Sequence, residues 1–151
     1  MTAQIRLGTS SFTADGWNGT FYPKGMKSAD YLRYYSSRFD TVEVDSTFYR
    51  CPTIEAVHNW ALKTPPGFIF SLKVPQTITH QKVLIACEKE FEEFVSTVQV
   101  LGEKLGPMVF QFPYFNKDVF NTPVQFSRSA QAILQEITAR RWVQVRYRDS
   151  K

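Results

Sequence analysis

The sequence predicts an α/β fold of the TIM-type (β/α) barrel kind, incomplete here, with about five strands and four helices. Segments typical of strands alternate with helical segments of roughly ten or more residues, which favours a parallel sheet with right-handed crossovers. Each predicted strand has one apolar and one largely polar face, as expected when helices cover only the outside of a barrel. At 151 residues the chain is shorter than the roughly 200 residues that a complete eight-stranded barrel needs.

The individual elements follow from hydrophobic periodicity and from capping residues. Apolar side chains repeat every second residue in the strands and every third or fourth residue in the helices. Ser28 and Thr53 are expected to cap the first two helices, and Thr122-Pro123 begins the last one. In chain order, these signals predict a strand at 5–9, a helix at 30–38, a strand at 41–46, a helix at 54–63, a strand at 68–74, a helix at 88–105, a strand at 107–112, a helix from 123 to about 137, and a strand at 143–147.

The apolar side chains define the faces that should form the core. On the helix at 88–105 they lie along one stripe, and on the strands they lie on one side, where helices are expected to cover them. The helix stripe is Phe91, Phe94, Val95, Val98 and Leu101, and the strand faces are Ile5/Leu7, Val42/Val44, Phe68/Phe70/Leu72, Met108/Phe110/Phe112 and Val143/Val145. Residues 1–151 are therefore treated as a single domain.

The opposite strand faces carry charged and polar side chains that would point into the barrel. Buried charges must be paired, because an isolated buried ion is very costly. For Glu43 and Arg6, deep in the barrel, a structural ion-pair network is the favoured interpretation. For Asp45, Lys73 and Arg146, nearer the carboxyl ends of the strands, a structural network and a functional site at the barrel mouth both remain open.

The composition and the lack of a targeting signal predict an ordinary soluble protein. The net charge of +4, from 18 basic and 14 acidic residues, permits a phosphate-bearing partner but does not predict one, since no block of like charge occurs. No secretory signal or apolar run of membrane-spanning length is present. Cys51 and Cys87 are therefore expected to be reduced thiols in a cytoplasmic protein that does not contact the membrane.

Several motifs in order resemble the YecE-like family, also called domain-of-unknown-function family seventy-two. The resemblance covers essentially the whole chain and implies a TIM-barrel fold, but it implies no function, because members of the family are mostly uncharacterised. The matching motifs are Gly8-Thr9-Ser10-Ser11-Phe12, Gly16-Trp17, Phe21-Tyr22-Pro23, the run from Phe39 to Arg50, Trp60-Ala61, Thr64 to Phe68, Lys73-Val74-Pro75, Ile78-Thr79-His80, Leu105-Gly106-Pro107 and Phe110 to Pro113.

The chain departs from the family pattern in three ways. Asp45 stands where the family usually has Asn, and Gln144 stands where the fifth strand often has Glu. Members of the family are also well over 151 residues long, so we expect this chain to form only the amino-terminal part of the barrel. Its first and fifth strands would be open edges, and open edges favour pairing with another chain. Such a truncated chain is expected to be marginally stable alone and to self-associate.

The candidate site is distributed over several strand ends, as in barrel enzymes. Asp45 is the candidate base and His80 the candidate acid, while Lys73 and Arg146 would stabilise an anion. Aromatic side chains at this end could stack on a sugar or a base. The predicted ligand-binding residues are Thr9, Ser10, Trp17, Glu43, Ser46, Tyr49 and Gln111.

Neither a metal nor a cofactor is expected. The chain has two histidines and no Cys-x-x-Cys, whereas zinc needs three or four His or Cys ligands. Magnesium on Glu43 and Asp45 has no support from their spacing. Three functions remain: a hydrolase or lyase acting on a phosphate- or sugar-containing ligand, a non-catalytic binding protein for an anionic ligand or nucleic acid, or an inactive fragment. The residues alone leave open whether the chain is an enzyme.

Overall fold

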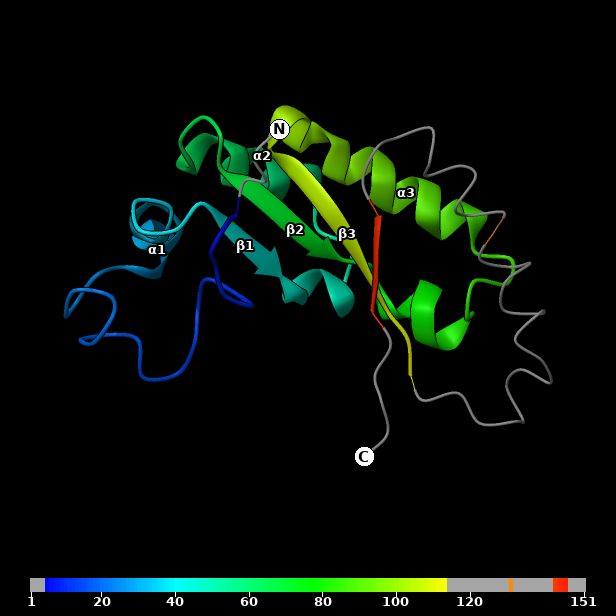
Figure 1. The fold of residues 1–151 in the computed structure, drawn as a ribbon, viewed down its shortest axis with the longest axis horizontal. Helices are drawn as coiled ribbons and strands as arrows, with labels where there is room; N and C mark the ends of the chain where they lie inside the picture. The colour runs from blue at the N-terminus through cyan, green and yellow to red at the C-terminus, as the bar shows by residue number, and fades with distance from the viewer. Residues whose placement is uncertain (1–4, 114–130, 132–142, 147–151) are drawn as a thin grey trace.

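The computed structural model describes residues 5–113, 131 and 143–146 (Figure 1). Strands and helices alternate along these residues, as the periodicity predicts. In chain order the elements are α1 (Ser28–Tyr35), β1 (Thr41–Val44), the 3₁₀ turn η1 (Asp45–Phe48), α2 (Ile54–Lys63), β2 (Ile69–Lys73), the π-helical turn η2 (Thr77–Gln81), α3 (Glu88–Val98), the 3₁₀ segment η3 (Gln99–Lys104), β3 (Leu105–Gln111) and β4 (Val143–Arg146).

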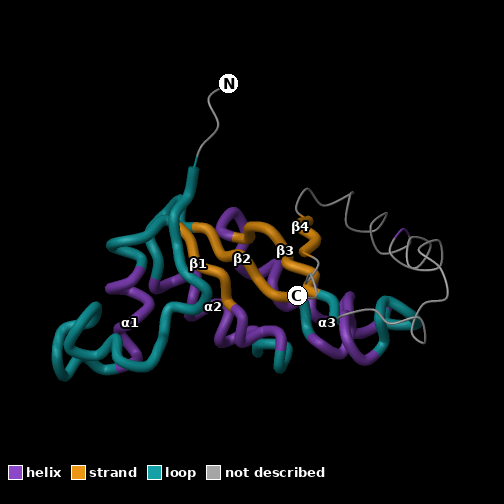
Figure 2. The backbone as a smooth tube through the Cα atoms, turned by 60° about the horizontal axis from the view of Figure 1, so that its bottom comes forward, coloured by secondary structure: helices purple, strands orange, loops and turns teal. Residues whose placement is uncertain are grey.

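The four strands form one parallel sheet in the order β1-β2-β3-β4. Thr41 pairs with Ile69, Leu72 with Met108, and Gln111 with Arg146. Consecutive parallel strands need long crossovers, and α2 and α3 supply the first two. Figure 2 shows the strands side by side. Because they are parallel, their carboxyl ends share one edge of the sheet. The predicted α/β class with a parallel sheet is confirmed, and the sheet that the described residues form is open.

The predicted first strand is wrong as a strand. Residues 5–9 have no strand of their own, and the segment meets β1 through one bridge between Ser10 and Glu43. The start of the segment projects away from the sheet (Figure 2), where no described helix covers it. Ile5 is therefore 90% exposed and Leu7 70% exposed, which corrects the expectation that both pack beneath helices.

The helices differ from expectation at their ends. α2 spans Ile54–Lys63 as predicted, and Thr53 Oγ1 accepts a hydrogen bond from the Ala56 N–H at 3.2 Å. α1 begins at Ser28 and has no side-chain cap, so the capping role expected of Ser28 is wrong. The predicted 88–105 helix ends as α3 at Val98 and continues as η3, where Gly102 takes non-helical angles (φ 56°, ψ −125°).

The core lies between one face of the sheet and the helices, with α2 and α3 along the same side (Figure 1). The side chains expected there are buried on β1, β2 and β3 and on the α3 stripe. One strand departs from the polar-inward pattern, because Val109 occupies the opposite face of β3 and is fully buried. The buried set includes Val42, Val44, Phe70, Leu72, Met108, Phe110, Phe91, Phe94, Val95, Val98 and Leu101.

Part of the prediction falls beyond what the structure describes. Apart from Gln131, the helix expected from 123 to about 137 lies outside the described residues, as does Tyr147 at the end of the predicted fifth strand. The strand itself is present as β4. Within the described ranges, no helix combines the length and apolar character needed to cross a membrane.

Candidate site at the carboxyl ends of β1 and β2

The turn η1 continues directly from β1 and is tied to the end of β2. Thr47 is buried, and its Oγ1 lies 2.8 Å from the carbonyl oxygen of Val44 and 2.6 Å from that of Lys73. This hydroxyl therefore joins the carboxyl ends of both strands. It also fixes the position of the following Phe48, which ends η1.

The turn η2 follows β2 and carries His80 back toward η1. The Pro75 carbonyl accepts hydrogen bonds from the N–H groups of Ile78 (3.0 Å) and Thr79 (3.2 Å). The Lys82 N–H donates to the Thr77 carbonyl, five residues earlier, at 2.9 Å, and this bond makes the segment a π-helical turn, a rare geometry that is frequent at functional sites. Thr79 Oγ1 lies 2.9 Å from His80 Nδ1, which orients the imidazole.

Phe48, Lys73 and His80 meet at this end of the sheet, and we call them the mouth cluster. The Lys73 ammonium lies 5.5 Å from the centre of the Phe48 ring, and the His80 ring lies 4.9 Å from it at 82°. Burial, and secondarily the charge of Lys73, lower the pKa of His80 below its usual 6.5. Because Lys73 makes no ion pair within the described residues, its charge is available to an anionic ligand.

The other candidates on η1 surround the mouth cluster. Asp45 is half-buried, and within the described residues its carboxylate makes no hydrogen bond or ion pair. Ser46 is exposed, and Tyr49, just after η1, is 73% exposed with its ring 5.2 Å from that of Phe48. The structure thus brings Asp45, Ser46 and Tyr49 to the same end of the sheet as Lys73 and His80.

Thr9 and Ser10 lie beside β1, and Thr9 is used structurally. The Thr9 N–H donates to Tyr35 Oη at 2.7 Å, and Thr9 Oγ1 donates to the Ser11 carbonyl at 2.7 Å. Ser10 is exposed and forms the bridge to Glu43. Glu43 pairs with Ser71 on β2, which places it one step back from the strand ends. The hydroxyl of Ser10 remains accessible, whereas that of Thr9 is engaged within the fold.

Trp17 is not brought to the mouth cluster by any contact. Its ring packs in an aromatic cluster, 5.1 Å from Phe21 and 6.0 Å from Tyr22. Its carbonyl accepts hydrogen bonds from the N–H groups of the same two residues, at 3.0 and 2.8 Å. These contacts favour a packing role for Trp17, next to α1.

Gln111 and Arg146 are neighbours in register at the ends of β3 and β4. Lys73 pairs with Val109, so Gln111 lies two residues further toward the carboxyl edge. The sheet therefore places both residues on the edge that also carries Lys73. Arg6, expected within the ion-pair network, donates from its guanidinium to the Gly67 carbonyl at 2.8 Å.

Two positions that shape the candidate site were missed by sequence reasoning, namely Thr47 and Thr79. Both orient a candidate residue, and only the turn geometry of η1 and η2 reveals this. Each threonine directly precedes an aromatic or imidazole residue, but that signal is weak in a single sequence. Among the described residues, no group of three or more His, Cys, Asp or Glu is arranged to hold a metal ion.

Comparison with known proteins gives one family. The family model described as "Protein of unknown function DUF72" matches residues 6–148. The chain is 34% identical over 82 residues to UPF0759 protein YecE of Escherichia coli K12, covering 54% of this chain and 30% of that protein. It is 35% identical over 106 residues to UPF0759 protein YunF of Bacillus subtilis 168, covering 65% of this chain and 38% of that protein.

Two solved structures share the fold. Both are crystal structures of a DUF72 family protein from Enterococcus faecalis V583. One matches 95% of this chain with a TM-score of 0.67 and 22% identity. The other matches 97% of this chain with a TM-score of 0.69 and 23% identity. This chain covers 51% of either solved chain. The chain therefore has the fold of about half of these longer relatives.

Proposed function

This chain belongs to the DUF72 family, which is described as proteins of unknown function, and we propose that it carries a hydrolase- or lyase-type site for a phosphate- or sugar-containing ligand. The site lies at the carboxyl ends of β1 and β2. The observation that carries the proposal is the mouth cluster, where the ammonium of Lys73 and the imidazole of His80 flank the ring of Phe48.

Lys73 is the anion-binding residue of this proposal. Its side chain is half-buried and makes no ion pair within the described residues. A cation in a partly dry site attracts an anion more strongly than one in open water, because the effective dielectric constant is lower. Parallel strands also end here, at the edge where barrel folds place their sites. A phosphate group is the simplest ligand that satisfies this geometry.

His80 is the proton-transfer group. Burial and the charge of Lys73 lower the pKa of His80, so the imidazole is neutral near pH 7. A bound anion offsets the charge of Lys73 and raises the pKa of His80, so that the ligand itself supplies the condition for His80 to act as an acid. Asp45, half-buried on η1, is the base of the same proposal.

The aromatic residues extend the site toward sugars. Phe48 and the exposed Tyr49 lie with their rings 5.2 Å apart at 87°. Exposed aromatic faces next to polar groups suit sugar rings, since the ring packs on C–H groups while hydroxyls reach nearby donors. Ser46, Ser10 and Gln111 are the proposed partners of those hydroxyls.

The proposal also covers the complete fold, the cellular location and the self-association of the chain. The open parallel sheet is taken as part of a TIM-type barrel, because strands and helices alternate and the chain matches about half of longer relatives. Cys51 and Cys87 are both free, which supports a reducing, cytoplasmic location. The outer edges of the sheet are proposed to pair with a second copy of the chain.

An NMR titration of the imidazole protons tests the site directly. The chain has two histidines, and His58→Gln identifies the resonances of His80. Adding inorganic phosphate should raise the pKa of His80 and shift its resonances saturably. Lys73→Met should weaken this response at least tenfold, whereas Lys24→Met, which removes an exposed lysine elsewhere, should not change it.

Turnover separates an enzyme from a binding protein. The chain should hydrolyse p-nitrophenyl phosphate slowly, and His80→Gln should abolish turnover while phosphate still binds. Phosphate binding without turnover would instead indicate a non-catalytic binding protein. If phosphate leaves the His80 resonances unchanged, the site assignment is wrong.

A further inference from the structure

The segment between η2 and α3 has an unusual backbone. We call residues 82–86 the strap. Val83, Leu84 and Ala86 have positive φ angles of 48°, 65° and 47°, although none is glycine. This region is disfavoured for residues with a Cβ atom, and most of all for β-branched valine. Such a conformation persists only where the surrounding structure holds it, and it is found frequently near functional sites.

Backbone hydrogen bonds tie the strap to the turn that carries His80. The Lys82 N–H donates to the Thr77 carbonyl at 2.9 Å, and the Leu84 N–H donates to the Ile78 carbonyl at 3.0 Å. Val83 and Leu84 are buried in the core, with 8% and 6% exposure. His80 therefore lies within a loop whose two sides are bonded together.

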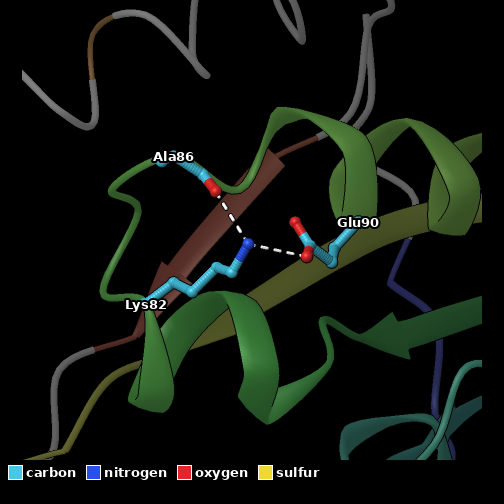
Figure 3. A network of polar contacts seen from close by, with 3 residues as sticks. All are labelled: Lys82, Ala86 and Glu90. Carbon is cyan, nitrogen blue, oxygen red and sulfur yellow. Dashed lines mark hydrogen bonds and ion pairs between the residues drawn. The ribbon is translucent and has the colours of Figure 1, made fainter.

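The side chain of Lys82 closes the far end of the strap (Figure 3). Its ammonium donates to the Ala86 carbonyl at 2.8 Å and to Glu90 Oε1 at 2.6 Å. Glu90 lies in the first turn of α3, so one ammonium joins the strap to a helix anchored in the core. The second carboxylate oxygen, Oε2, is buried and has no partner within the described residues.

We propose that Lys82 is a positioning residue for the mouth cluster, because it holds the strained strap and thereby fixes the η2 turn on which His80 stands. The inference rests on the function proposed above. The Lys82 ammonium bonds to Ala86 and Glu90 and not to Phe48 or Lys73, so it acts through the backbone of 77–86. Glu90 is its partner in this role, since the carboxylate fixes the ammonium next to the Ala86 carbonyl.

An ordinary surface ion pair does not account for this arrangement. The two side chains are each about one third exposed, and exposed pairs contribute little to stability. Here, however, the same ammonium also binds a backbone carbonyl in a left-handed conformation. Releasing the ammonium frees Ala86 to relax to a favoured φ, and Thr77 and Ile78, whose carbonyls accept hydrogen bonds from the strap, can then move with it.

The test measures the pKa of His80 by NMR in the ligand-free chain. Lys82→Met should move the pKa of His80 up toward its ordinary value, because the imidazole loses its dry position near Lys73. Lys82→Arg should retain the wild-type pKa by keeping the ion pair. Lys89→Met removes a neighbouring exposed lysine without touching the strap and should leave His80 unchanged.

A second variant keeps the proposal testable if Lys82→Met does not fold. Glu90→Gln preserves the size of the side chain and should accelerate hydrogen exchange at the Leu84 amide at least tenfold relative to the Phe91 amide on α3. A folded Lys82→Met variant with unchanged His80, or unchanged Leu84 exchange in Glu90→Gln, would overturn the proposal. Neither readout needs a ligand. A failure of this proposal can therefore be distinguished from a failure of phosphate to bind.

Discussion

The ammonium of Lys73, on strand β2, lies 5.5 Å from the centre of the ring of Phe48, on turn η1. The two residues are 25 positions apart in sequence, and the parallel pairing of β1 with β2 brings them to one edge. A cation over an aromatic face is attracted to the ring quadrupole. This contact holds Lys73 at the carboxyl edge, where its charge also reaches His80.

Removing Lys73 should therefore change the titration of His80. The charge of Lys73 lowers the pKa of His80 in addition to burial, so Lys73→Met should raise that pKa without restoring it fully. The imidazole proton resonances measured against pH give the value. Lys24→Met serves as the charge-matched control, and an equal rise in both variants would contradict a local effect.

The folded chain should lose stability in mild acid through His80. Its pKa in the folded state lies below the ordinary 6.5, so the unfolded chain binds a proton more readily. The stabilisation is complete above about pH 6.5 and declines as the pH falls toward the folded-state pKa. Urea unfolding at several pH values should show a smaller decline for His80→Gln than for His58→Gln, in which an exposed histidine is replaced. Equal declines would exclude His80 as the cause.

Helix α2 has a side-chain cap and α1 has none, so similar substitutions at the two helix starts should lower the free energy of unfolding by different amounts. Thr53→Ala removes the hydrogen bond to the Ala56 N–H and should lower the free energy of unfolding by about 1 kcal/mol. Ser28→Ala, at the start of α1, removes no cap and should cost less than about 0.5 kcal/mol. Chemical denaturation of both variants checks this, and equal costs would contradict the observed caps.

Gly8 should not tolerate a side chain. An added Cβ would lie 2.0 Å from the Thr41 carbonyl oxygen, which forces the amino-terminal segment away from β1. Gly8→Ala should destabilise the chain by about 1–3 kcal/mol and expose the Glu43 amide, which donates to the Thr9 carbonyl at 3.0 Å. Hydrogen exchange at Glu43 reports the second effect. Ser10→Ala, in the same segment, should leave that exchange unchanged.

Self-association should depend on the exposed apolar edge beside β1. Leu7 and Leu62 are both 70% exposed, but Leu7 lies in the edge segment and Leu62 on α2. Light scattering at rising concentration should show association that Leu7→Asp reduces and Leu62→Asp leaves intact, because a charge at an edge opposes strand pairing. A chain that stays monomeric at all concentrations would contradict the proposed pairing.

Local patterns in the sequence predicted much of the fold. The bounds of α2 follow from Thr53 and from the prolines after Lys63, and the alternation Val42/Val44 against Glu43 identified the buried face of β1. These signals are local, since a cap or a two-residue period involves near neighbours in sequence. The same locality explains the misassigned strand at 5–9, because alternation carries no information about pairing, and the segment meets β1 only through the bridge between Ser10 and Glu43.

The candidate site was predicted only as a set of strand-end residues. The order of the elements was enough to place Asp45, Lys73, Gln111 and Arg146 at one edge, because parallel strands end together. Tertiary structure alone decided that Phe48, Lys73 and His80 meet, since η1 and η2 are irregular turns held by Thr47, Thr79 and the Lys82 contacts. Sequence periodicity has no signal for such turns, because they follow neither the two-residue repeat of a strand nor the 3.6-residue repeat of an α-helix. One of the bonds that hold them, from Thr47 to the Lys73 carbonyl, also joins residues 26 positions apart.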